Sequence, residues 1–318
     1  MGGSNVRGAA ALVAAALVLA TATSGLAQSS DYRTADPRAL VNAWTHAPAA
    51  ERGPIVDALI ERRAQAQPAL WEAARFGSSQ EKKFACSMIA ELRDHDGVDA
   101  LVDASADADV HVRRRAATAL RILADRRAVP RLRAITRDES DLGVLKTALV
   151  ALGKLGDARD VATIAGFLGH GDAGVRVVAA GALAMLGDER GLAIALQATG
   201  DPDPGVQKSA TYALGFFTAP AAAAKLDAII ADPQADWRAY ALLAKAERAL
   251  AGQPPAQQVA LLDEFAQMRS RTVAEWAVDR LTDLGGADAA AALRRATKRS
   301  TPVAGLAARR LRALEAPR

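Results

Sequence analysis

Apolar residues recur at helical spacing in the stretch 172–200. Five of them, at i, i+4, i+7, i+8 and i+11, share one face of a predicted helix: Val175, Ala179, Ala182, Leu183 and Leu186. Asp172 is positioned to cap the start of this helix, and Gly187 to end it. A second apolar-periodic segment follows Asp188. The stretch therefore predicts two short helices joined by a tight turn, and such a pair needs neighbours to be stable in water.

The same pattern recurs along the chain. An aligned leucine appears in seven places: Leu92, Leu120, Leu152, Leu183, Leu214, Leu281 and Leu311. Eight residues before each stands a bulky apolar residue: Phe84, Val112, Val144, Val175, Val206, Val273 and Val303. Most spacings are close to 30 residues, and the longer gap before Leu281 leaves room for a degenerate unit at 234–268. A repeat of this period predicts a solenoid.

The predicted fold class is all-α, an α-solenoid of stacked helix pairs. Hydrophobic residues make up 51% of the chain and aromatic residues only 4%, and no alternating β-branched run predicts a strand. Residues 37–76 match the repeat poorly and are interpreted as an N-terminal helical cap. The repeats follow as residues 77–318, continuous with the cap, with units starting near Ser79, Asp109, Asp141, Asp172, Asp203 and Arg271.

The first residues have the three-part form of a secretory signal peptide. Arg7 precedes an apolar run at 9–20, and Gly25-Leu26-Ala27 fits a cleavage site after Ala27. We therefore predict a signal peptide at 1–27, a disordered lead-in at 28–36, and a periplasmic or secreted mature chain. The alternative is an uncleaved membrane anchor, although the run is short for a spanning helix.

Three segments carry a family resemblance: Val175-Arg176-x-x-Ala179-Ala180-x-Ala182-Leu183-x-x-Leu186-Gly187-Asp188, Val112-Arg113-x-x-Ala116-Ala117-x-Ala119-Leu120, and Ala151-Leu152-x-x-Leu155-Gly156-Asp157. They resemble the HEAT repeat in its short bacterial form, the phycobilisome-lyase HEAT-like repeat. The resemblance implies a right-handed superhelix with the Val-Arg helix on its concave side. It also implies that the arginine of this signature pairs with aspartates of adjacent turns, for which Asp141, Asp172 and Asp203 are candidates.

The sequence contains no catalytic, cofactor or metal motif, so we predict a non-enzymatic protein. The four histidines, His46, His95, His111 and His170, form no i, i+4 ligand pair. None is followed by glutamate, unlike the iron-binding His-Glu pairs of a HEAT-like hydroxylase. Asp94-His95-Asp96 is interpreted as a solvated turn between two helices. Cys86, the single cysteine, is expected to be packed in the core.

The concave helices are expected to expose the residues two, six and nine places after each anchor valine. In the middle units this surface is small and apolar, with basic residues beside it, which suits an extended peptide or an acidic protein segment. The predicted partner-binding residues are Arg114, Lys146, Val150, Val177, Lys208 and Tyr212. Gly153 and Gly181 either belong to this floor or allow close helix packing, and Gly215 is assigned to the floor.

The leading functional hypothesis is thus an exported scaffold that binds a protein or peptide on its concave face. One alternative is an accessory subunit or metal-dependent enzyme of the cell envelope, with a metal near His95 or His111. Another is a binder of anionic envelope polymer, through the nine arginines between Arg113 and Arg137, if that stripe is more than a solvated face. After the predicted cleavage, the chain keeps 39 of its 40 basic residues and all 36 acidic ones, and this net charge of +3 is too small to predict a nucleic-acid partner.

Overall fold

The computed structural model describes residues 31–298 and 303–316, and within these ranges it contains helices and no strand. The predicted all-α solenoid is confirmed. The predicted signal peptide lies outside the described residues. None of the helices within the described ranges is both long and apolar enough to cross a membrane.

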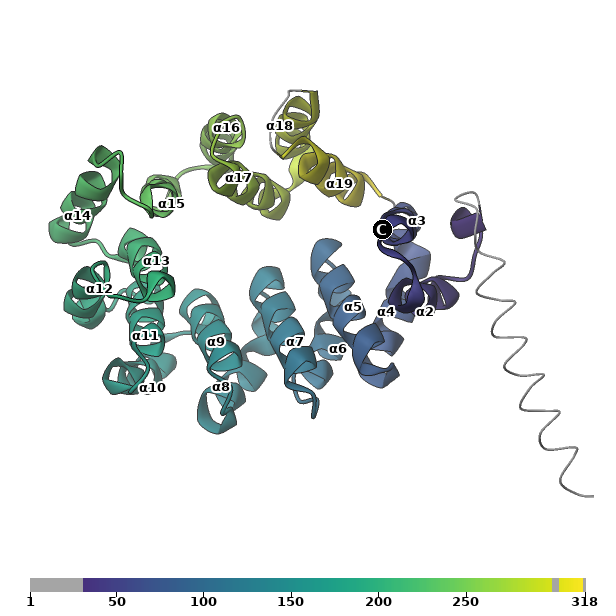
Figure 1. Ribbon diagram of the computed structural model, residues 1–318, viewed down its shortest axis with the longest axis horizontal. Coiled ribbons are helices and arrows are strands. Elements are labelled where there is room, and N and C mark those ends of the chain that lie inside the picture. Colours follow the sequence, from purple (N-terminus) through teal and green to yellow (C-terminus); the bar gives the residue numbers. More distant parts are fainter. Residues whose placement is uncertain (1–30, 299–302, 317–318) are drawn as a thin grey trace, which may run out of the picture.

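The helices form an inner and an outer layer (Figure 1). The chain begins with α2 (Pro37–His46), α3 (Ala49–Glu61) and α4 (Arg63–Phe76). The inner layer continues through α5 (Ser79–Glu91), α7 (Val110–Leu123), α9 (Leu142–Leu155), α11 (Ala173–Met185), α13 (Pro204–Ala213), α15 (Arg238–Leu250), α17 (Arg271–Leu284) and α19 (Ala304–Glu315). The outer layer contains α6 (Val98–Ala104), α8 (Val129–Asp138), α10 (Ala158–Gly166), α12 (Leu192–Ala198), α14 (Pro220–Ala231), α16 (Pro255–Ala266) and α18 (Gly286–Lys298).

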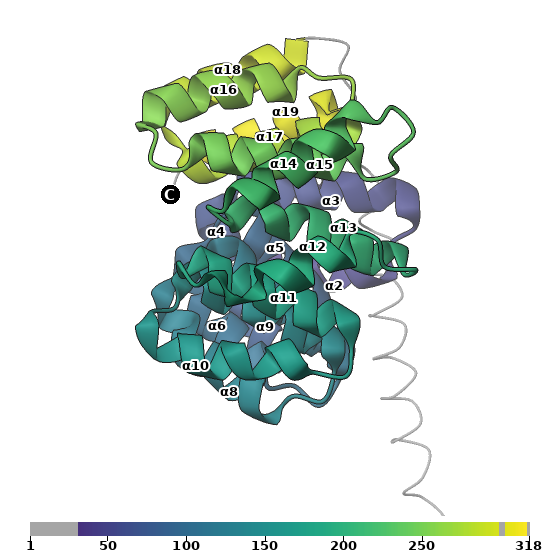
Figure 2. The same ribbon diagram turned by 90° about the vertical axis from the view of Figure 1, so that its left-hand side faces the viewer.

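Short 3-10 helices occur mainly in the turns between helices. They are η1 (Asp31–Arg33), η2 (His95–Gly97), η3 (Arg126–Ala128), η4 (Phe167–Gly169), η5 (Glu189–Gly191) and η6 (Leu214–Phe216). Five of the six, η2 to η6, directly adjoin an inner or outer helix, and each tightens the connection to the next helix. Figure 2 shows the two layers from the side.

The predicted unit starts are helix caps. The side chains of Asp109, Asp141, Asp172 and Asp203 each accept a hydrogen bond from a backbone N–H in the first turn of an inner helix. The two anchor positions of the repeat are buried in every unit except at Leu311, which is partly buried. Local capping and a two-anchor core therefore explain why each repeat folds as a helix pair.

The predicted disordered lead-in is wrong for residues 31–36. Tyr32 is only 4% exposed and belongs to the N-terminal core cluster, and its hydroxyl donates a hydrogen bond to Glu51 at 3.0 Å. Asp36 caps α2. The buried Tyr32 ring, together with the hydrogen bond from Arg62 to the Ala35 carbonyl, holds this polar segment against α3.

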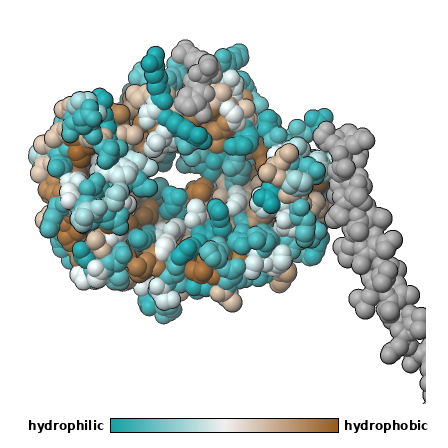
Figure 3. All heavy atoms as spheres, viewed as in Figure 1, coloured by the Kyte–Doolittle hydropathy of each residue, from teal (hydrophilic) through white to brown (hydrophobic). Residues whose placement is uncertain are grey.

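The solenoid closes into a ring, which the repeat pattern did not predict. Helix α19 packs against α3, so the last described inner helix meets the first part of the chain (Figure 1). Arg63 in α4 donates to the carbonyl of Ala313 at 3.1 Å, and Arg93 at the end of α5 donates to Asp283 in α17 at 2.7 Å. Figure 3 shows the hollow at the centre of this ring, which we call the lumen.

The contact that closes the ring, here called the seam, is mainly polar. Arg310 of α19 pairs with Glu91 of α5, and Arg312 pairs with Asp57 of α3. Ala313 is the residue of α19 that joins the N-terminal core cluster. A cavity of about 390 Å³ separates α3 from α19 beside these contacts. Ion pairs rather than a continuous apolar interface therefore hold the ends together.

We predict that Arg310→Gln weakens the closed ring. Arg310 is 8% exposed and bridges Glu91 and Asp279, so its removal leaves two carboxylates without their shared cation. Breaking such a buried pair costs about 3 kcal/mol. Chemical denaturation measures this loss of unfolding free energy. As a control, Arg159→Gln removes an exposed, solvent-screened ion pair with Asp157 and is expected to leave the unfolding free energy nearly unchanged. Equal losses in both variants would contradict a specific role for the seam.

Candidate functional site: the inner face of the ring

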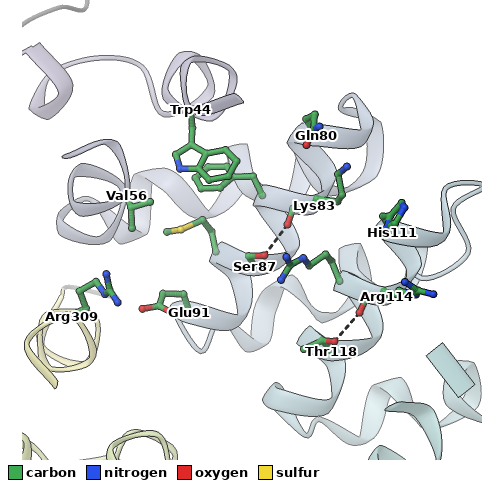
Figure 4. A pocket seen from close by; sticks show the side chains of 13 residues that line it. Trp44, Val56, Gln80, Lys83, Ser87, Glu91, His111, Arg114, Thr118 and Arg309 are labelled. Atoms are coloured by element: carbon green, nitrogen blue, oxygen red, sulfur yellow. Dashed lines mark hydrogen bonds between the residues drawn. The ribbon is translucent and has the colours of Figure 1, made fainter. Parts of the chain in front are cut away.

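A cavity of about 880 Å³ on the inner face lies between α2, α3, α5, α7 and α19. We call it the Trp44 groove. It is lined by Trp44, Val56, Gln80, Lys83, Phe84, Ser87, Met88, Glu91, His111, Arg114, Arg115, Thr118 and Arg309 (Figure 4). Because α3 and α19 both contribute to its walls, the groove depends on closure of the ring.

The floor of the Trp44 groove is an apolar surface built on a stacked aromatic pair. The rings of Trp44 and Phe84 stack with centroids 4.1 Å apart and an interplanar angle of 14°. The guanidinium of Arg52 lies 4.8 Å from the Trp44 ring centroid, in a cation–π contact. Met88 and Val56 extend the floor toward α19. The floor is therefore organised before any partner binds.

The rim of the Trp44 groove carries free positive charge. Within the described parts of the chain, Lys83, Arg115 and Arg309 have no ion pair or hydrogen bond from their side chains. They come from α5, α7 and α19, so three separate inner helices surround the floor. The one acidic residue of the lining, Glu91, is bound by Arg310. This arrangement favours an acidic ligand.

Three of the predicted partner-binding residues also connect neighbouring units. Arg114 donates to both carboxylate oxygens of Asp141, at 2.9 and 2.6 Å. This guanidinium holds the pKa of the Asp141 carboxyl at about 2. Lys146 lies 3.9 Å from Asp172 in the same way, and Lys208 lies 5.5 Å from the ring centroid of Tyr240. Arg114 is the one predicted residue that also lines the Trp44 groove.

Val177, which was predicted to belong to an apolar floor in the middle units, is buried and cannot contact a partner. That side chain is 1% exposed because α11 packs against α13, in a cluster with Val206 and Ala210. Val150 is half-buried. Tyr212 is also half-buried, and its hydroxyl donates to Glu247 of α15 at 2.9 Å. Burial, followed by the charge of Glu247, raises the pKa of Tyr212.

The signature arginines do not pair with the aspartates that the resemblance suggested. Arg113 binds Glu139 through two hydrogen bonds, at 2.8 and 3.0 Å, and also donates to backbone carbonyls of its own preceding loop. Arg176 donates to the carbonyls of His170 and Gly171. The capping aspartate Asp141 binds Arg114, which is the residue after the signature arginine Arg113. The signature arginine therefore fixes the loop before its helix.

The arginine-rich stretch 113–137 is not a continuous free stripe. Five of its nine arginines have partners: Arg113, Arg114, Arg127, Arg131 and Arg133. Each of these five has a partner outside the stretch, because the stacking of helices and repeats brings distant groups together: Glu139, Asp141, the His95 carbonyl, Ser105 and Asp160. This placement reduces the positive surface available to an anionic polymer.

In the Asp94-His95-Asp96 turn, Asp94 has a structural role. Asp94 is 1% exposed and accepts hydrogen bonds from Trp71 at 2.6 Å and Gln67 at 2.9 Å, so the expectation of a solvated turn is wrong there. No group of three or more His, Cys, Asp or Glu side chains is placed to hold a metal ion within the described ranges. Cys86 is buried, and desolvation raises the pKa of its thiol to about 12.

The HEAT-repeat family model matches residues 66–153, 107–173 and 161–244, together more than half of the chain. The chain belongs to the HEAT-repeat family. The match begins within α4, ahead of the predicted repeat boundary at residue 77. No curated protein matches the chain.

Several solved structures are similar in fold. A chain of the CpcE–CpcF complex of phycocyanin lyase from Nostoc sp. PCC7120 is 20% identical with a TM-score of 0.52, over 71% of this chain and 92% of that one. An engineered protein is 21% identical with a TM-score of 0.40, over 92% and 88% of the two chains. Human deoxyhypusine hydroxylase in complex with glycerol is 19% identical with a TM-score of 0.32, over 83% and 98%.

Gly153 and Gly215, two glycines of the predicted floor, lie where neighbouring inner helices pack closely. A Cβ atom on Gly153 would lie 2.7 Å from the Ala182 Cα atom, and one on Gly215 would lie 2.7 Å from the Ala244 carbonyl oxygen. We expect Gly153→Ala or Gly215→Ala to lower the unfolding free energy by about 1–3 kcal/mol, since backbone must move. Denaturant midpoints measure this effect.

The matched control is Gly166→Ala at the end of α10, where an added Cβ meets nothing within 4 Å. This variant is expected to be neutral or to gain up to about 1 kcal/mol. If Gly153→Ala is as harmless as Gly166→Ala, the inner helices do not pack as closely as described.

Proposed function

We propose that this protein is an exported, non-enzymatic scaffold whose Trp44 groove binds an acidic segment of a protein partner. The observation that carries the proposal is the pairing of a stacked Trp44–Phe84 floor with the free cations Lys83, Arg115 and Arg309. Tryptophan and arginine are the residues most often found at energetic centres of protein interfaces.

The dimensions and chemistry of the groove support a peptide segment as the ligand. Its volume of about 880 Å³ falls in the range of pockets that enclose several side chains. An apolar side chain of the partner would rest on Trp44 and Met88, while flanking carboxylates would meet Lys83 on one side and Arg309 on the other (Figure 4). The preformed floor lowers the entropic cost of binding.

The comparisons add support for a protein partner in general terms. The similar phycocyanin lyase chain was solved in complex with a second chain, CpcE with CpcF. Extended inner surfaces are the usual binding surfaces of repeat proteins. Lyase activity is not carried over, because fold does not determine function.

Binding to the groove is testable with acidic peptides of defined sequence. Replacing Lys83, Arg115 and Arg309 by Glu is expected to weaken binding of a peptide rich in Asp, Glu and Leu by at least about tenfold, since each contact is charge-assisted. Fluorescence anisotropy with a labelled peptide measures the affinity.

The matched control reverses three exposed or half-buried cations that lie away from the groove: Arg126, Arg137 and Lys225. It changes the net charge by the same amount and is expected to weaken binding far less. Equal weakening in the two triple variants would show that net charge, not the groove, attracts the peptide. A photo-crosslinking residue at Ser87 is expected to label the bound peptide, and labelling that fails there while binding persists would place the site elsewhere.

Export is proposed from the sequence of residues 1–27. Expressed with its full sequence in a bacterial host, the chain is expected to appear in the periplasm or medium with Gln28 as its first residue. Intact-mass measurement of the purified protein checks the cleavage. Recovery of the uncleaved chain from the membrane fraction would support an anchor instead.

A further inference from the structure

Two cations face the lumen without a partner. Arg121, in the last turn of α7, and Lys154, in the last turn of α9, have no hydrogen bond or ion pair to any described residue. Arg121 is half-buried, whereas Lys154 is exposed toward the lumen. Most other lysines and arginines on the inner face, by contrast, bind a carboxylate or a carbonyl.

Both residues line one cavity of about 460 Å³ whose walls come from opposite sides of the ring. Arg121 and Lys154 contribute from α7 and α9, while Arg280 and Asp283 contribute from α17. A neighbouring cavity of about 550 Å³ shares Lys154 and Arg280, so these two side chains stand between two open spaces.

The other charged groups around this cavity are already engaged. Arg93 binds Asp283 at 2.7 Å and lies 3.8 Å from Asp279. Arg280 lies 3.4 Å from Glu247, which also accepts hydrogen bonds from Tyr212 and Trp276. The nearby acids are therefore neutralised by other groups, and the positive charges of Arg121 and Lys154 are left in excess.

This excess of positive charge within the ring is energetically unfavourable. Burial by the surrounding walls lowers the pKa of Arg121 and of Lys154, and neighbouring acids only partly oppose this effect. For half-buried Arg121, a charge held partly away from bulk water without a partner costs free energy, whereas exposed Lys154 adds to the positive charge of the same cavity. A counter-ion that entered the lumen would recover that cost.

We propose that the lumen cluster, defined as Arg93, Arg121, Lys154 and Arg280, binds a compact multivalent oxyanion. Phosphoryl and carboxylate groups share the required chemistry, because planar guanidinium groups bind both in a bidentate manner and an ammonium group adds a point charge. The cavity volume of about 460 Å³ accommodates a small molecule rather than a folded partner. This site is separate from the Trp44 groove and shares no lining residue with it.

A purely helix-terminal role is the main rival for these two cations. A positive side chain in the last turn of a helix interacts favourably with the helix dipole. That role accounts for positive residues at the ends of α7 and α9, but it predicts no ligand binding. It also predicts that removal of the charges destabilises the free protein.

The experiment compares inorganic tripolyphosphate and citrate, each titrated into the full-length protein by calorimetry at constant ionic strength. We expect one ligand per chain for at least one of the two anions. If tripolyphosphate alone binds, the natural ligand is a phosphorylated compound; if citrate alone binds, it is a polycarboxylate. Absence of binding by both anions would overturn the proposal.

The double variant Arg121→Gln/Lys154→Gln is expected to weaken binding by about tenfold or more, because two charge-assisted contacts are lost. Without ligand it should melt at the same temperature as the wild-type chain or higher. The control Arg126→Gln/Lys225→Gln removes the same charge outside the lumen and should bind normally. Lys154→Arg, which keeps the charge, should also bind.

Two results would contradict this assignment. One is equal loss of anion binding in the lumen variant and in its control. The other is loss of binding on reversal of Lys83, Arg115 and Arg309, which would place the anion in the Trp44 groove.

Discussion

The arrangement of the whole inner face depends on the polar contact between α19 and its neighbours α3 and α5. Arg310 and Arg312 of α19 bind Glu91 and Asp57, and these pairs join helices from opposite ends of the chain. Closure turns the concave side of a solenoid into a lumen. It also completes the Trp44 groove, since Arg309 and Val56 reach that groove from α19 and α3.

Within the ring, neighbouring units are joined by two kinds of interaction. Small side chains let the inner helices approach closely, most clearly where Gly153 meets Ala182. Basic residues then extend to the capping aspartate of the next unit, as Arg114 does to Asp141. Most positive charges of the inner face are thereby used in structure. The cations without partners, at the rim of the groove and in the lumen cluster, are for this reason the ones that indicate a ligand site.

The repeat itself could be predicted from the sequence, whereas the site could not. Helical spacing and capping residues are local properties, and the anchor positions and Asp caps were predicted correctly for this reason. The groove depends on contacts between residues far apart in sequence, such as Trp44 with Phe84 and Arg309. Val177 was expected to be accessible because its helix was considered without α13, which covers it. Trp44, one of four tryptophans in the chain, is the one residue whose type alone points to the groove.

A distance measurement across the seam tests the closed ring most directly. Gly53 in α3 and Gly305 in α19 line the seam cavity, and both have room for a side chain, so Gly53→Cys/Gly305→Cys accepts a spin label at each position. Buried Cys86, with its thiol pKa of about 12, should resist labelling. Electron–electron double resonance is expected to show one narrow distribution at short distance. A broad distribution at long distance would mean an open superhelix and would contradict the closed ring.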